Sequence, residues 1–168
     1  LIDGGFQLSG TIKPNGNKNA ALPVIAASLL TDEECILRNI PDIEDVRMML
    51  RIAEELGASI HKEDKNSYRI KGTISNSSID QELGKKIRAS ILFAGPLLAR
   101  LGNAELPPPG GDVIGRRRLD THFLAFQELG SGINATHKDF IKLTASKLLG
   151  KEILLDEASV TGTENIIM

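Results

Sequence analysis

Apolar residues recur along the chain with two alternating periods, and their order predicts the secondary structure. Residues 17–30 are mostly small and apolar, which predicts a largely buried helix. A second helical stretch begins at Asp42, the expected N-cap, has Asp45 in its first turn and stops at Gly57. Apolar and polar residues then alternate on both sides of a polar turn, as in paired strands. In chain order the predicted elements are a strand at 10–13, a helix at 17–30, a strand at 35–38, a helix at 42–56, and strands at 58–61 and 68–71.

The same pattern returns 73 positions later, which indicates a duplicated unit. Residues 114–133 repeat the landmarks of residues 41–60, and both units carry a proline inside an apolar helical stretch. The pairs with this offset are Pro23 and Pro96, Glu55 and Glu128, Leu56 and Leu129, Gly57 and Gly130, and Ile60 and Ile133. The elements predicted for the second unit are a weak strand at 77–79, a helix at 85–101, a strand at 103–106, a helix at 118–129, and strands at 133–136 and 140–144.

A third unit begins with a predicted strand at 152–155 and a helix at 161–168. The sequence therefore predicts an α/β fold of repeated units at 9–72 and 77–146, with the start of another at 148–168. The last turn is apolar and has no glycine, proline or basic stop signal. This favours a chain that is part of a longer polypeptide. The alternative is a short chain whose last helix packs against a partner.

Composition narrows the classes of function. A formal net charge of -2 gives the chain no general basic field for nucleic acid. A single cysteine, Cys35, excludes an internal disulfide, and no CxxC or HExxH spacing indicates a metal site. No run of about 18 apolar residues predicts a membrane span. No charged-then-apolar leader opens the chain, so the cytoplasm is the expected compartment.

The segment 107–120, PPPGGDVIGRRRLD, combines flexible backbone with concentrated charge. Glycines allow a backbone to approach a ligand closely, and the three arginines at 116–118 supply planar donors that suit phosphate oxygens. Asp112 is the first carboxylate in this segment and lies between the glycine pair and the arginines. This position makes it a candidate proton donor at an anion site. The alternative is an ordinary surface turn followed by a solvated arginine face.

Other candidate groups lie at the starts of the first helices of successive units. Lys18 begins a predicted helix, where it either adds charge to an anion site or is simply solvated. Arg88 either lines a cleft or extends to water, and Ser159 either caps the third helix or helps to hold a diphosphate. If the units pack about a pseudo-symmetry axis, these residues face one cleft together with the Asp112 loop. His122 is expected to be a core or capping residue rather than a catalytic one.

Four ordered motifs resemble the enolpyruvyl transferases, in particular the family that acts on UDP-N-acetylglucosamine. The motifs are GNKNAALP at 16–23, RAS at 88–90, PGGDVIGRR at 109–117 and SVTGTEN at 159–165. The resemblance extends from about residue 6 to residue 168. It implies an inside-out α/β barrel of repeated βαβαββ units, in two domains with the active site between them. It also implies that this chain is the N-terminal part of the enzyme and has no turnover alone.

By this resemblance, the reaction transfers the enolpyruvyl group of phosphoenolpyruvate to the 3-hydroxyl of UDP-N-acetylglucosamine, for peptidoglycan precursor synthesis. The implied partners are these two substrates and the remaining part of the same enzyme, without a metal or organic cofactor, nucleic acid or membrane. Lys18, with Asn19 beside it, matches the phosphoenolpyruvate contact, and Asp112 matches the catalytic acid. The positions that match sugar-nucleotide contacts are Arg88, Arg117, Arg118, Leu119, Asp120, Thr121, Glu157, Ala158, Ser159 and Val160.

Three residues depart from the commonest family pattern. Asp112 stands where a cysteine, the target of fosfomycin, is usual, so we expect insensitivity to that epoxide. Arg118 replaces a proline, and Glu157 replaces a lysine, which puts a diphosphate contact in doubt. Two alternatives remain at this point. One is the sister enzyme that acts on shikimate 3-phosphate, and the other is a non-catalytic module that binds a nucleotide sugar.

Overall fold

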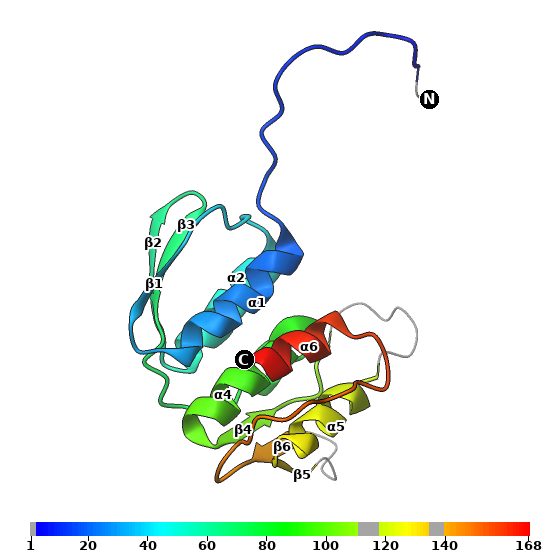
Figure 1. The fold of residues 1–168 in the computed structure, drawn as a ribbon. Helices are drawn as coiled ribbons and strands as arrows, with labels where there is room; N and C mark the ends of the chain where they lie inside the picture. The colour runs from blue at the N-terminus through cyan, green and yellow to red at the C-terminus, as the bar shows by residue number, and fades with distance from the viewer. Residues whose placement is uncertain (1–2, 111–117, 135–139) are drawn as a thin grey trace.

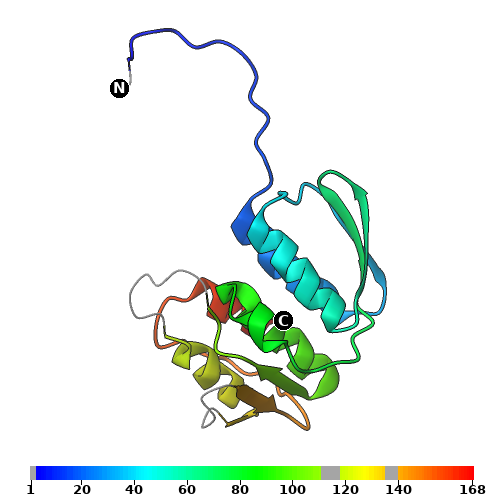
Figure 2. The ribbon, with the colours of Figure 1, turned by 180° about the vertical axis from the view of Figure 1, so that it is seen from behind.

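The computed structural model describes residues 3–110, 118–134 and 140–168, which form two α/β halves of similar construction (Figure 1, and from behind in Figure 2). In the first half a three-stranded antiparallel sheet packs beside two helices. The elements are α1 (Lys18–Ala27), η1 (Ser28–Leu30), β1 (Glu34–Leu37), α2 (Glu44–Glu55), β2 (Ser59–Asp64) and β3 (Ser67–Lys71). β3 lies between β1 and β2. The apolar side chains of α2 recur on one face, so Val46, Met49 and Ala53 are buried together.

The second half repeats this arrangement. Its elements are α3 (Gln81–Gly84), η2 (Arg88–Phe93), α4 (Ala94–Leu101), β4 (Asn103–Leu106), α5 (Asp120–Glu128), β5 (Gly132–Asn134) and β6 (Ile141–Thr144). β6 lies between β4 and β5, as β3 lies between β1 and β2. The pairing also repeats at the offset of 73, because Ser59 faces Lys71 in one sheet and Gly132 faces Thr144 in the other.

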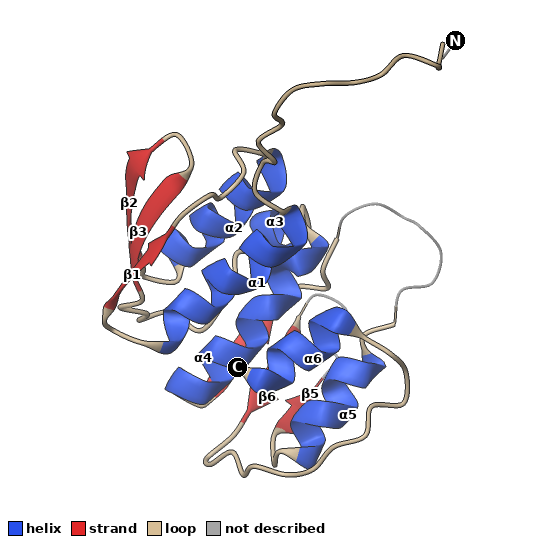
Figure 3. Ribbon diagram, turned by 45° about the horizontal axis from the view of Figure 1, so that its top comes forward, coloured by secondary structure: helices blue, strands red, loops and turns tan. Residues whose placement is uncertain are grey.

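Three helices bring the halves together. α1, the η2–α4 segment and α6 (Val160–Ile167) run in roughly the same direction, with their N-terminal ends toward the same side of the molecule (Figure 1). α1 contacts η2, and α6 contacts both η2 and α4. Figure 3 shows the first sheet at the edge of the molecule, with the helices of both halves gathered beside it. The fully buried side chains of the core include Ile25, Leu29, Met49, Phe93 and Leu97.

Several predicted elements are confirmed. The helices after residues 17 and 42, the hairpin around the polar turn and the strand at 103–106 lie where the apolar pattern places them. Gly57 and Gly130 follow α2 and α5 with φ angles of 110° and 99°, values that favour glycine at a helix end. Asp45 lies in the first turn of α2, as expected.

Other predictions are wrong or incomplete. Residues 10–13 form no strand, because no neighbouring strand accompanies them, and Ile12 is 91% exposed. Residues 152–155 also lie outside any strand, and the weak strand at 77–79 is reduced to one bridge between Ser78 and Glu105. The helix predicted at 85–101 begins only at Arg88, because Ile87 is extended with φ of -138° and ψ of 133°, and it is a 3-10 helix to Phe93 before α4 follows. Asp42 does not cap α2; its carboxylate accepts a 2.8 Å hydrogen bond from Arg47, and Ile43 holds the N-cap position.

The described residues form two separate sheets and no closed barrel. Among these residues no helix has both the length and the apolar character that are needed to cross a bilayer. In the same part of the chain, no three His, Cys, Asp or Glu side chains gather as ligands for a metal ion.

Candidate functional site

The starts of three helices carry the cations and hydroxyls singled out in the sequence. Lys18 is the first residue of α1, Arg88 is the first residue of η2, and Ser159 is the N-cap of α6. Because the N-terminal ends of these helices lie on the same side (Figure 1), the three residues belong to one end of the helix layer. Helix N-termini carry unpaired N–H groups and positive partial charge, which favours an anion at this end.

Lys18 is held by an acid from the neighbouring helix. Its Nζ lies 2.7 Å from Oδ2 of Asp45, in the first turn of α2, and both side chains are partly exposed. Asn17 fixes the start of α1, because its Oδ1 accepts a 3.2 Å hydrogen bond from the N–H of Ala20. Asn19 is exposed. The ammonium group of Lys18 is thus oriented at a solvent-accessible helix start.

Arg88 joins the start of η2 to the residues that precede α5. Its Nη2 donates to the carbonyl oxygen of Arg118 at 3.1 Å, across 30 residues of sequence. The backbone at Gly110 also approaches this region closely. A Cβ at Gly110 would lie only 1.5 Å from the carbonyl oxygen of Lys85, so only glycine fits there. Asp112 and Arg117, two predicted site residues, lie outside the described residues.

Arg118 lies among carboxylates. Its Nε donates to Asp120 Oδ2 at 2.6 Å, and its Nη2 lies 3.2 Å from Asp156 Oδ2. The hydrogen bond to Asp120 is the main reason that the pKa of Arg118 is raised, and the negative charges of Asp156 and Glu157 add to it. The guanidinium is therefore already engaged by acids, in contrast to the free phosphate-binding donor suggested by the sequence.

Asp156 also binds Thr121, the second residue of α5 and the last residue of the predicted sugar-nucleotide segment 117–121. The Oγ1 of Thr121 donates to Asp156 Oδ1 at 2.7 Å, and Thr121 is fully buried. Leu119 occupies the N-cap position of α5, and Asp120 is the first residue of that helix. Asp156 was not singled out in the sequence, because its partners are 35 and 38 residues away and no local pattern reports them.

The segment before α6 ends in a well-formed helix cap. The Oγ of Ser159 accepts a 3.1 Å hydrogen bond from the N–H of Gly162, and its carbonyl oxygen accepts from the N–H and hydroxyl of Thr163. The capping interpretation of Ser159 is therefore what the structure shows. Its neighbours in the predicted sugar-nucleotide segment, Glu157, Ala158 and Val160, are exposed or partly exposed.

Behind this surface, His122 lies in the core, as the sequence predicted. Asn165 Nδ2 lies 3.0 Å from His122 Nδ1 and donates to the carbonyl oxygen of Ile91 at 2.9 Å. His122 Nδ1 must therefore accept, which leaves the ring proton on Nε2, 3.3 Å from Thr161 Oγ1. Burial, assisted by the positive charge of Arg88, lowers the pKa of His122 to about 4. The ring is neutral at pH 7 and organises the core.

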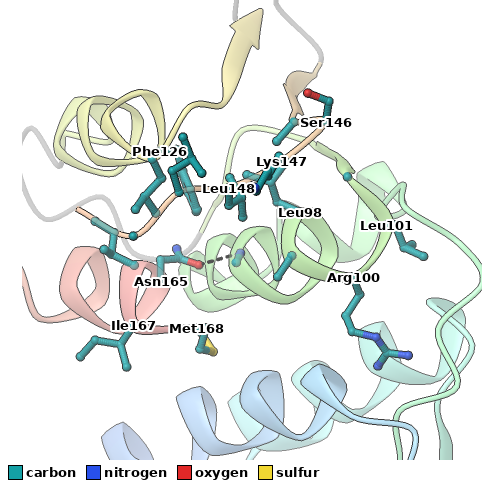
Figure 4. Close-up of a pocket in the computed structure, with 18 residues that line it drawn as sticks. Leu98, Arg100, Leu101, Phe126, Ser146, Lys147, Leu148, Asn165, Ile167 and Met168 are labelled. Carbon is teal, nitrogen blue, oxygen red and sulfur yellow. Dashed lines mark hydrogen bonds between the residues drawn. The ribbon is translucent and has the colours of Figure 1, made fainter.

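A cavity of about 660 Å³ lies elsewhere, between α4, α5, α6 and residues 145–150 (Figure 4). Leu98, Phe126 and Leu148 contribute to its wall, together with Asn165, whose Oδ1 accepts from the N–H of Gly95. Lys18, Arg88, Arg118 and Ser159 do not line it. The predicted site and this cavity are thus separate features of the described structure.

The fold matches solved enolpyruvyl transferases. It is similar to the enolpyruvyl transferase NikO from Streptomyces tendae, with a TM-score of 0.69 and 23% identity over 86% of this chain and 32% of that chain. It is also similar to EPSP synthase from Acinetobacter baumannii, with a TM-score of 0.70 and 18% identity over 94% of this chain and 37% of that chain. The α/β halves therefore have the fold of the enolpyruvyl transferase class.

A family profile described as EPSP synthase (3-phosphoshikimate 1-carboxyvinyltransferase) matches residues 2–168, and the chain belongs to this family. Curated relatives are closer in sequence. The chain is 59% identical to the UDP-N-acetylglucosamine 1-carboxyvinyltransferase of Treponema denticola, over 100% of this chain and 39% of the relative. It is 52% identical to the protein of the same name from Treponema pallidum, over 99% of this chain and 39% of the relative. The chain thus spans 39% of the length of these relatives.

Proposed function

We propose that the full-length protein containing this chain transfers the enolpyruvyl group of phosphoenolpyruvate to the 3-hydroxyl of UDP-N-acetylglucosamine, the first committed step of peptidoglycan precursor synthesis. The fold proposed for that protein is an inside-out α/β barrel, to which residues 9–72, 77–146 and 148–168 contribute two units and the start of a third. The proposed compartment is the cytoplasm. No metal or organic cofactor is part of the proposal.

One structural observation carries this proposal. Arg88 binds the carbonyl oxygen of Arg118, and both Arg118 and Thr121 bind Asp156, the residue immediately before Glu157. Three segments that are distant in sequence, at 88, 118–121 and 157–160, are therefore held together by side-chain hydrogen bonds. These are the segments that match the sugar-nucleotide contacts of the family, and their proximity supports a single site for UDP-N-acetylglucosamine.

Lys18 is the proposed ligand of phosphoenolpyruvate, with Asn19 beside it. Its ammonium group lies at the N-terminus of α1, where the helix dipole also favours an anion. Asp45 compensates this charge, with its Oδ2 2.7 Å from Lys18 Nζ. Phosphoenolpyruvate therefore competes with Asp45 for Lys18. Because both side chains are partly exposed, breaking their ion pair costs little free energy.

Asp112 is the proposed general acid. In the addition step, the methylene carbon of phosphoenolpyruvate takes a proton from the acid, while the sugar 3-oxygen bonds to the neighbouring carbon and loses its own proton. In the elimination step, the bond from that carbon to the phosphate oxygen breaks, phosphate leaves, and loss of a proton from the methyl group restores the double bond. A carboxylic acid can donate in this way if its pKa is raised toward neutrality. The sequence places Arg116 and Arg117 in the same segment, and in this proposal their positive charge complements that of phosphate.

The test is an assay of the purified full-length protein with phosphoenolpyruvate and each of two acceptors. We expect phosphate release and an enolpyruvyl product with UDP-N-acetylglucosamine, no turnover with shikimate 3-phosphate, and loss of turnover without loss of substrate binding in Asp112→Asn. Turnover with shikimate 3-phosphate alone would assign the protein to the sister activity. Tight binding of the nucleotide sugar without any turnover would assign it to a binding module.

A further inference from the structure

Asp156 occupies a bridging position that the sequence did not reveal. Its Oδ1 accepts from the hydroxyl of Thr121 at 2.7 Å, and its Oδ2 lies 3.2 Å from Nη2 of Arg118. Both partners come from the start of the α5 region, whereas Asp156 itself precedes the segment that leads into α6. One carboxylate thus fastens two stretches of chain that are distant in sequence.

The two contacts of Asp156, one to Thr121 and one to Arg118, have different environments. Thr121 is fully buried, so its hydroxyl depends on Asp156 for a hydrogen bond that is not available from water. The side chains of Arg118 and Asp156 are 46% and 35% exposed, so their ion pair is screened and contributes little to stability. A contact of low energetic value that nevertheless fixes the direction of an arginine suits a role in positioning.

We propose that Asp156 is a positioning residue for the nucleotide sugar: it sets the segments 118–121 and 157–160 at the spacing that the ligand requires. This inference rests on the proposed function and adds to it a residue that does not itself touch the ligand. Asp156 keeps Arg118 from pairing with Asp120 alone, and it orients the backbone of Thr121 through the side chain. The chemical class of ligand is a nucleoside diphosphate sugar, as in the proposed reaction.

Two substitutions separate the two arms of the bridge. In Asp156→Asn, the amide keeps an oxygen for Thr121 but turns an N–H₂ donor toward the guanidinium of Arg118, so only the arginine arm is lost. In Thr121→Val, the shape of the buried side chain is kept and only the threonine arm is lost. Glu128→Gln is the matched control, because Glu128 lies at the other end of α5 and pairs with Lys151 on the surface.

The experiment measures the KM for each substrate, kcat and the Tm of the full-length protein and these variants. We expect Asp156→Asn to raise the KM for UDP-N-acetylglucosamine about tenfold, while kcat and the KM for phosphoenolpyruvate stay within about twofold. Thr121→Val should raise the same KM several-fold. In the double variant, the KM for UDP-N-acetylglucosamine should rise by less than the product of the two single fold-changes. The reason is that both changes act through the same carboxylate. Glu128→Gln should behave like the unaltered protein.

Other results would overturn the inference. One is an Asp156→Asn variant with the same KM for UDP-N-acetylglucosamine as Glu128→Gln. Another is a general loss, in which the Tm, kcat and both KM values change together, because that indicates a structural role only. If the unaltered protein has no turnover, the proposed function fails. The role of Asp156 is then decided by calorimetry, which compares the Kd for UDP-N-acetylglucosamine of Asp156→Asn with that of Glu128→Gln. Absence of any binding by the unaltered protein overturns both.

Discussion

Asn165 Nδ2 lies 3.0 Å from Nδ1 of His122, and this contact ties α6 to α5 inside the core. The same amide group also binds the carbonyl oxygen of Ile91 and the N–H of Gly95, so Asn165 joins three helical segments. Asn165 and His122 are each only 1% exposed. This buried polar network therefore connects η2, α4, α5 and α6, which makes it a determinant of stability and of the positions of the η2 and α6 helix starts in the proposed site.

The protonation of His122 should destabilise the fold in acid. Its pKa is about 4 in the folded protein, against 6.5 for an unperturbed histidine, because burial disfavours the charged ring. The unfolded chain thus binds more protons between these values, and the stabilising contribution, fully present above about pH 6.5, is lost as the pH falls toward 4. Since one pKa unit equals about 1.4 kcal/mol, the loss approaches about 3 kcal/mol.

Urea unfolding of the full-length protein between about pH 7 and pH 4 measures this dependence. His122→Asn should flatten the curve in that range, because the titrating group is gone. His61→Asn is the control, since His61 is exposed on β2, and it should leave the curve unchanged. An unaltered slope in His122→Asn would show that other groups cause the acid sensitivity.

Arg100 is expected to hold the two halves together. From α4, its Nη1 donates to the carbonyl oxygen of Leu29 at 2.8 Å, and its Nη2 lies 2.6 Å from Asp32 Oδ1. Arg100→Ala should lower the free energy of unfolding by about 1–3 kcal/mol, because a partly buried carbonyl group loses a charged donor. Arg100→Lys should recover less than half, since a single ammonium group does not replace the fork of a guanidinium. Equal stability of the lysine variant and the unaltered protein in denaturant melts would contradict this role.

Glu157 should weaken the binding of the nucleotide sugar. It is exposed in the proposed site, next to Asp156, and its negative charge opposes a diphosphate. Glu157→Lys should lower the Kd for UDP-N-acetylglucosamine several-fold at low salt, with a smaller gain at high salt because the charges are screened. Glu152→Lys, an equal change of charge at another exposed position, is the control for general electrostatic attraction. An equal decrease of this Kd in both variants would contradict a site-specific role for Glu157.

Asp112 should determine the response to fosfomycin. A carboxylate is a poorer nucleophile than a thiolate, so the full-length protein should keep its turnover after incubation with this epoxide. Asp112→Cys should gain time-dependent inhibition and one covalent adduct by intact mass. Rapid inactivation of the unaltered protein, with the label on Asp112, would contradict the proposed role of this carboxylate.

The repeat could be predicted from the sequence because local sequence signals mark it. Gly57 and Gly130 end helices with positive φ, and the alternation of apolar residues around Ile60 and Ile133 follows the pleat of a strand. The offset of 73 then predicts the same strand pairing twice, and the structure has it. The strand at 10–13 was wrong for the opposite reason: an alternating pattern reports a preference for pairing, but not whether a partner strand is present.

The candidate site could be predicted only in part from the sequence. Lys18, Arg88 and Ser159 stand at helix starts, which sequence signals mark, and the structure places those starts at one end of the helix layer (Figure 1). Asp156 and Asn165 were not predicted, because their roles depend on contacts with residues 35 or more positions away. Such contacts follow from the packing of α5 and α6, which no local pattern encodes.

The most direct test of the account is a crystal structure of the full-length protein with UDP-N-acetylglucosamine. We predict that the nucleotide sugar lies at the helix starts, in contact with Arg88 and with the segments 118–121 and 157–160. A ligand bound instead in the cavity lined by Leu98 and Phe126, with no contact to Arg88, would contradict the central claim.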